Sequence, residues 1–108
     1  MANDPKRRDD TEGDVAVKRE RKTERARRYM VIFHNDDYTT KWFVVLVLME
    51  FFYMSEAAAT TFMMGVHEQG RGVVGVYTKD VAESKVEQVH EFAKEHGMPL
   101  RLTVEPEE

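Results

Sequence analysis

The feature that most constrains the fold is a strand pattern that runs into a polar cluster, in the stretch YMVIFHNDDYT at Tyr29–Thr39. Apolar side chains alternate there with a period of two, so that Tyr29, Val31 and Phe33 share one face of an expected strand. The pattern breaks at Asn35–Asp37, because Asn and Asp side chains hydrogen-bond their own backbone and favour turns. The sequence therefore predicts a strand over residues 29–34 that ends in a cluster of hydrogen-bond acceptors.

A helix is expected directly after this cluster, over Lys41–Phe52 (KWFVVLVLMEFF). The valines of this run would also tolerate a strand. A helix is favoured because the apolar run continues for about three turns and because Thr39 or Thr40 can cap it. Since the segment is apolar almost all round, we expect this helix to be buried on most sides.

A second helix is expected over Ala57–Gln69, with Ser55 as its N-cap and Gly70 as its stop. His67 lies near the end of this helix. Its spacing alone is typical of a surface histidine that complements the negative end of the helix dipole.

A short β-rich run follows at Gly72–Tyr77, in which Gly75 marks a bulge or a close approach. A third helix is then expected over Val81–His96, with its N-cap at Thr78 or Asp80. Its apolar positions form one stripe and its acidic positions fall outside that stripe, which is typical of an amphipathic helix with a solvated face.

The last alternating run, Leu100–Val104, completes the order β-α-α-β-α-β. Three short strands are not stable alone, so one face of the sheet must pack on the helices. We expect an α+β fold, a small two-layer domain with a three-stranded sheet packed on three helices. Periodicity leaves open how strands separated by helices pair; we expect the antiparallel arrangement.

Composition divides the chain into two parts. Residues 1–27 hold nine Lys or Arg, seven Asp or Glu and almost no large apolar side chains, so we expect a disordered N-terminal extension. Residues 28–108 hold seven basic and thirteen acidic residues and form the expected folded core. An acidic core argues against a nucleic-acid-binding face and suits the attraction of cationic groups.

Other bulk properties narrow the class of protein. The 108 residues allow one domain, and the lack of cysteine excludes disulfides, thiolate metal sites and a cysteine nucleophile. The N-terminus lacks the apolar core of a signal peptide, and the longest apolar run is too short to span a bilayer. We therefore expect a soluble, cytoplasmic protein that has no membrane contact. We also expect a monomer.

Patterns typical of catalysis are weak. The only serines are Ser55 and Ser84, and neither lies in a nucleophile-elbow sequence. The run GRGVVG does not match a phosphate-binding loop. A metal site is the sharper enzyme-like alternative, in a small metal-binding protein, although no HExxH spacing is present. Its imidazole and carboxylate ligands would be His34, Asp36, Asp37 and His67.

The same polar groups fit a site for a protonated amine better than they fit a metal site. A protonated amine presents only N–H donors, so its site should offer an amide oxygen, a carboxylate and a neutral imidazole nitrogen. Apolar side chains of the first two helices could line a pocket beside these acceptors, and methionine adapts to differently shaped partners. The same apolar residues could equally be core. The acceptors are Asn35, Asp36 or Asp37, and His67; the apolar candidates on the second helix are Met63 and Val66.

At these residues the chain resembles the ClpS family, the bacterial adaptors that deliver N-degron substrates to the ClpAP protease. The resemblance covers residues 29–104, and it rests on several motifs in the right order. They are YxVxxxNDDYT at Tyr29–Thr39, FV at Phe43-Val44, FF at Phe51-Phe52, MxxVHxxG at Met63–Gly70, GVYTKDVAESKV at Gly75–Val86 and PL at Pro99-Leu100.

The resemblance implies a binding site, a partner and a role. It implies that the α-amino group of a substrate is held by Asn35, Asp37 and His67, with Asp36 and Thr39 close by. The substrate's first residue, preferably Leu, Phe, Tyr or Trp, would enter a pocket lined by Val44, Met63, Val66 and Leu100. Docking on the N-terminal domain of the ClpA unfoldase would involve Asp80, Glu83 and Lys85. The family is not enzymatic and needs no cofactor.

Two positions depart from the family pattern. Thr40-Lys41 stand where the family usually has Pro-Met, and that Met is a gatekeeper at the pocket rim. We expect the stem of Lys41 to fold over the pocket with its ammonium in water, which would alter selectivity among the preferred first residues. Trp42 stands where Glu is common, and we expect it to be exposed beside the same rim.

Overall fold

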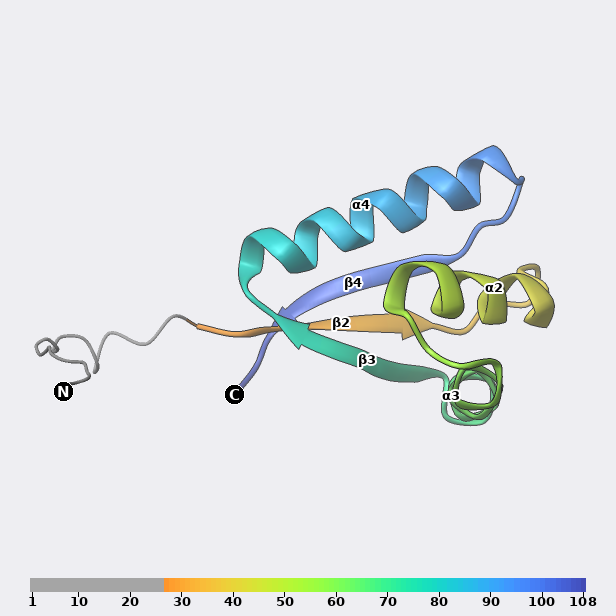
Figure 1. Cartoon of the computed structure of the whole chain (residues 1–108), viewed down its shortest axis with the longest axis horizontal. Helices are drawn as coiled ribbons and strands as arrows, with labels where there is room; N and C mark the ends of the chain where they lie inside the picture. Colours follow the sequence, from red (N-terminus) through yellow and green to blue (C-terminus); the bar gives the residue numbers. More distant parts are fainter. Residues whose placement is uncertain (1–26) are drawn as a thin grey trace, which may run out of the picture.

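The computed structural model describes residues 27–108, arranged as Figure 1 shows. The expected disordered extension, residues 1–27, lies outside the described residues except for Arg27. The elements follow the predicted order: β2 (Tyr29–His34), α2 (Lys41–Phe52), α3 (Glu56–Gln69), β3 (Arg71–Tyr77), α4 (Lys79–Glu95) and β4 (Arg101–Pro106). None of the helices in this part of the chain is long and apolar enough to cross a membrane.

The three strands form one sheet in the order β3-β2-β4, and both pairings are antiparallel. The expected α+β fold with an antiparallel sheet is therefore confirmed. In Figure 1, α4 runs along one face of the sheet, and α2 and α3 gather at the end where β2 stops and β3 begins. The end of the central strand is thereby enclosed by helices, which makes it a natural place for a cavity.

The core lies between the sheet and the helices. Val31 and Phe33 of β2 are fully buried there, as the alternation predicts. The Phe33 ring makes edge-on contacts with Phe52 of α2 and Phe62 of α3, with centroids 5.7 Å away in both cases. Phe43 of α2 is also buried and stacks on Phe92 of α4 at 5.4 Å. Aromatic packing therefore joins all three helices to the central strand.

Gly75 marks both a bulge and a close approach. The register of β2 with β3 shifts between Val31 and Ile32, because Val31 pairs with Gly75 and Ile32 with Val73. A Cβ atom on Gly75 would lie 2.5 Å from the Tyr77 hydroxyl oxygen, so only glycine leaves room for that ring. Burial raises the pKa of Tyr77 above its usual value.

The helix boundaries follow from their caps. The Thr40 hydroxyl accepts a hydrogen bond from the Phe43 N–H at 3.1 Å, and the Ser55 hydroxyl accepts one from the Ala58 N–H at 3.1 Å. Gly70 ends α3 in the left-handed conformation, with φ of 92°. Of the two threonines that could cap the first helix, Thr40 is the one used.

The N-cap of α4 is Thr78, one of the two residues expected there, although its side chain makes no capping hydrogen bond. Asp80, the other candidate, lies within the first turn of α4. The expected burial of α2 holds for eight of its twelve residues, which are buried or half-buried, but one outer face of the helix is open to solvent. Trp42, Met49 and Glu50 are exposed there, Trp42 by 69% as expected for that residue alone.

An ion pair crosses the face of the sheet that no helix covers. Arg71 of β3 and Glu105 of β4 lie on opposite sides of β2, and their side chains meet at 3.4 Å. This pair spans the central strand at the level of Ile32, which is fully buried although it lies outside the helix-facing core. Apolar surface on this face is therefore covered by the stems of long charged side chains.

Candidate functional site

A cavity of about 180 Å³ opens where β2 ends, between the polar turn and helices α2 and α3. Every residue predicted for amine binding or for the apolar pocket lines it. Two lining residues, Phe33 and His34, were not predicted for this pocket, although their place at the end of β2 adjoins the polar cluster. The lining residues are Phe33, His34, Asn35, Asp36, Asp37, Thr39, Lys41, Val44, Met63, Val66, His67 and Leu100.

The polar turn is tied to the end of α3 by the backbone. The Asn35 N–H donates a hydrogen bond to the Gly70 carbonyl oxygen at 2.9 Å. His67 lies one turn earlier on α3 and lines the same cavity. This bond explains why residues separated by about thirty positions in the sequence form one polar corner. Their proximity could not be derived from helical spacing.

Asp36 organises the turn. Its Oδ1 accepts hydrogen bonds from the backbone N–H groups of Tyr38 at 2.8 Å and Thr39 at 2.7 Å, and its Oδ2 accepts one from the Thr39 hydroxyl at 2.7 Å. Burial raises the pKa of Asp36, but these hydrogen bonds outweigh burial and hold the pKa below its usual value. Asp36 and Thr39 therefore shape the corner and keep a negative charge in it.

The remaining acceptors of the corner face solvent. The side chains of Asn35, Asp37 and His67 are exposed and make no hydrogen bond or ion pair with any residue in 27–108. The corner also adjoins the C-terminal end of α3, where the helix dipole places partial negative charge. Two carboxylates and a helix C-terminus together favour a cationic ligand group.

The other half of the cavity is apolar. Met63 and Val66 of α3 and Leu100 before β4 are nearly buried yet line it, and Val44 of α2 is half-buried. Lys41 lies at the rim, is exposed, and forms no hydrogen bond or ion pair within the described part of the chain. The cavity can therefore take an apolar side chain beside a cationic group.

The four residues considered for a metal do not form a ligand set. His34 Nε2 lies 2.7 Å from the Thr103 hydroxyl oxygen in a hydrogen bond across the sheet. Burial lowers the pKa of His34, and the positive charges of Arg101 and Arg71 lower it further. Within residues 27–108, no three His, Asp or Glu side chains gather closely enough to hold a metal ion. The metal-binding alternative therefore finds no support in this geometry.

The three residues expected to contact an unfoldase lie on the first half of α4, apart from the cavity. In Figure 1, α4 begins at the opposite end of the sheet from the polar turn. Asp80 and Lys85 line a separate surface hollow, whereas Glu83 is exposed outside it. The described residues thus carry two separate surfaces.

A small α+β domain with an acidic, amine-compatible corner beside an apolar cavity defines a small ligand-binding domain. Comparison with known proteins identifies the family to which this domain belongs. Residues 24–103 match the family model described as ATP-dependent Clp protease adaptor protein ClpS. The chain belongs to the ClpS family of Clp protease adaptors.

Individual relatives agree with this assignment. An ATP-dependent Clp protease adapter protein ClpS of Desulfatibacillum aliphaticivorans is 52% identical over 95 residues, which cover 88% of this chain and 91% of the relative. One from Myxococcus xanthus is 50% identical over 80 residues, covering 74% and 75%. The structure of Agrobacterium tumefaciens ClpS2 bound to L-phenylalaninamide matches with a TM-score of 0.75 and 43% identity, covering 77% of this chain and all of that one.

Proposed function

We propose that this chain binds the free α-amino group and the large hydrophobic first residue of N-degron substrates and delivers them to the ClpA unfoldase of ClpAP. The observation that carries this proposal is the corner of unpaired acceptors that opens onto an apolar cavity of about 180 Å³. L-phenylalaninamide, which the Agrobacterium relative binds, combines a free amine with an aromatic side chain and supports the same chemistry here.

The α-amino group donates to Asn35, Asp37 and His67 in this proposal. A protonated amine has three N–H donors and no acceptor, so an amide oxygen, a carboxylate and an imidazole nitrogen match it without leaving a donor unpaired. Each hydrogen bond to a charged group contributes about 1.5–3 kcal/mol. Asp36 and Thr39 contribute by holding the turn and its negative charge in place.

The side chain of the first residue fills the apolar half. Burial of Leu or Phe there contributes about 1.5–3 kcal/mol, with Val44, Met63, Val66 and Leu100 as the walls. An internal Leu or Phe lacks the amine and would leave the acceptor corner unpaired. The requirement for both groups gives specificity for the beginning of a polypeptide.

Delivery requires a second contact, which we assign to the first half of α4, at Asp80, Glu83 and Lys85. Its separation from the cavity allows substrate and unfoldase to bind at the same time. Residues 28–108 would then carry both binding functions.

A degradation assay tests the proposal. We expect ClpAP to degrade a reporter that begins with Phe faster when this chain is added, and to degrade an otherwise identical reporter that begins with Ser at an unchanged rate. Delivery depends on the apolar first residue, so only the first reporter should respond. Equal acceleration of both reporters, or of neither, would contradict adaptor function.

Lys41 should change the preference among first residues. Its ammonium at the rim can lie over an aromatic ring, which contributes about 0.5–1 kcal/mol at an exposed site. We expect Lys41→Met to shift the ratio of Phe to Leu affinity toward Leu by about two- to fivefold. Fluorescence titration with peptides that begin with Leu, Phe, Tyr and Trp measures this. An unchanged four-peptide profile in Lys41→Met would show that Lys41 has no part in selectivity.

A further inference from the structure

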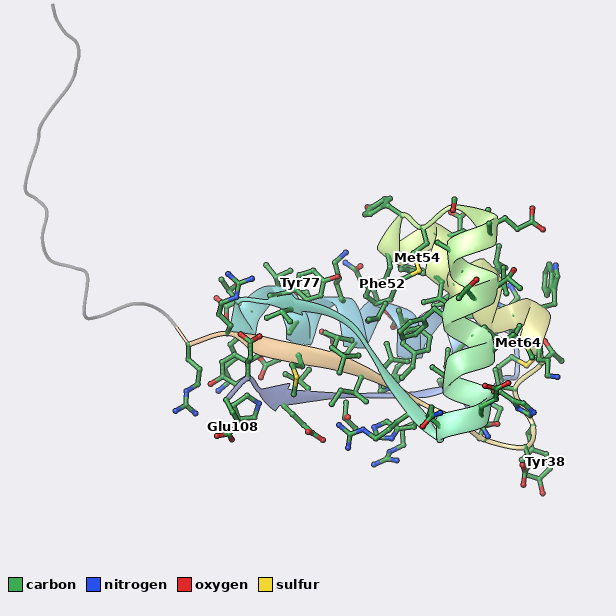
Figure 2. All side chains as sticks on the ribbon, turned by 90° about the horizontal axis from the view of Figure 1, so that it is seen from below. Tyr38, Phe52, Met54, Met64, Tyr77 and Glu108 are labelled. Carbon is green, nitrogen blue, oxygen red and sulfur yellow. The ribbon has the colours of Figure 1, made fainter. Side chains whose placement is uncertain are left out.

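Lys85 of α4 is half-buried, and its ammonium is held by groups from α2, from Tyr53 and from β3. Its Nζ donates a hydrogen bond to the Phe51 carbonyl oxygen at 3.0 Å. The same nitrogen lies over three aromatic rings, 5.3 Å from the centroid of Tyr53, 5.4 Å from that of Phe52 and 5.8 Å from that of Tyr77. Figure 2 shows Phe52 and Tyr77 on the same side of the molecule. The negative end of the α2 dipole and three ring faces together satisfy the ammonium.

Tyr53, the residue that ends α2, combines two unusual properties. It is the only non-glycine residue with positive φ in the described range, at 58°, a conformation that glycine adopts at lower cost. Its side chain is nevertheless a large aromatic ring that is 82% exposed. Residues held in sparsely populated backbone conformations cluster at functional sites.

The Tyr53 ring forms one wall of the surface hollow on α4. The hollow has a volume of about 360 Å³, and its other walls combine apolar, polar and charged groups. Val81, which also lines the hollow, is 44% exposed, and Asp80 adds a carboxylate in the first turn of α4. The lining residues are Tyr53, Asp80, Val81, Ser84, Lys85 and Gln88.

We propose that Tyr53 is the apolar anchor of the unfoldase-docking surface and that Lys85 positions its ring instead of pairing with a carboxylate of the partner. This inference rests on the docking role proposed above for the first half of α4. The complementary chemistry on the unfoldase is an apolar side chain that enters the hollow, flanked by cationic groups. The exposed carboxylates of Asp80 and Glu83 favour those cations.

The division of roles has a measurable consequence. If Lys85 acted by pairing with the partner, its removal would weaken docking whether or not Tyr53 was present. If it acts through Tyr53, its removal has little further effect once the ring is gone. A double-mutant cycle between the two positions separates these cases.

The experiment measures binding of the purified ClpA N-terminal domain to the full chain and to variants. We expect Tyr53→Gly to weaken docking by roughly tenfold or more. Thermal stability should be equal or higher, because glycine relieves the left-handed backbone. Tyr53→Phe keeps the aromatic ring, so its docking should be as tight as that of the unsubstituted chain. Tyr38→Ala is the matched control, since Tyr38 is 81% exposed on the distant turn labelled in Figure 2, and its docking should be unchanged.

For Lys85, we expect Lys85→Met to weaken docking in the wild-type background and to have no additional effect in Tyr53→Gly. Wild-type docking by Tyr53→Gly would overturn the anchor role, and additive losses in the double variant would overturn the positioning role. Absence of docking by the unsubstituted chain would instead refute the proposed unfoldase contact itself. Binding of a Phe-starting peptide, measured in parallel, should be unchanged in every variant.

Discussion

Acetylation of the α-amino group should weaken binding of a Phe-starting peptide by about 100-fold or more. The acetylated peptide retains one amide N–H but loses the positive charge and two donors. Each lost hydrogen bond to a charged group costs about 1.5–3 kcal/mol, and the acceptors left behind in the corner lose their partners. The apolar side chain is identical in both peptides, so the difference isolates the amine. Fluorescence anisotropy with the two labelled peptides measures it.

The variant Asp37→Asn tests whether the loss of affinity on acetylation arises at the polar corner. It removes one charged acceptor, so the ratio of free to acetylated affinity should fall by about tenfold. Glu50→Gln changes the same charge on the exposed outer face of α2 and should leave the ratio unchanged. Peptides that bind equally well with free and acetylated ends would refute recognition of the amine, whatever their affinity.

The fold was largely predictable because its local signals agree. The alternation in β2, the Ser55 cap and the glycine at the end of α3 each act within a few residues, and the structure places them as predicted. The outer face of α2 was not predictable, because an apolar segment does not reveal that its neighbours leave one side uncovered. Met49 is exposed for that reason, whereas the exposure of Trp42 was expected only from the resemblance to the ClpS family.

The site was predictable in composition but not in geometry. Residue types in the polar cluster indicated an amine, but His67 is brought to that cluster by the pairing of β2 with β3 and by the hydrogen bond from Asn35 to Gly70. Residue type alone also does not distinguish Asp36 from Asp37, and only the resemblance to the ClpS family gave them different expected roles. Asp36 accepts three hydrogen bonds within the turn, whereas Asp37 faces solvent.

Selectivity and stability are linked at this site, because the wall of the cavity is also the wall of the core. Met63, Val66 and Leu100 contact the cavity on one side and the central cluster on the other. A cavity kept open beside close-packed side chains leaves apolar surface without contacts, and a ligand side chain supplies them. The cavity keeps its shape only if β2, which ends in the polar turn, is held against the helices by its buried residues.

Phe33→Ala should test this link and should destabilise the domain by about 3–5 kcal/mol. Phe33 is fully buried, contacts Phe52 and Phe62 edge-on, and also lines the cavity, so its removal enlarges one continuous space. Denaturant titration measures the free energy of unfolding, and Phe-starting peptides should bind more weakly even where the variant is folded. Ile32→Val, on the sheet face without helices, should cost only about 0.5–1.5 kcal/mol and leave peptide affinity unchanged.

If Phe33→Ala does not fold, Phe33→Leu provides the same comparison with a smaller loss. Equal destabilisation by the changes at positions 32 and 33 would mean that the aromatic cluster does not fix the strand end from which the polar turn begins.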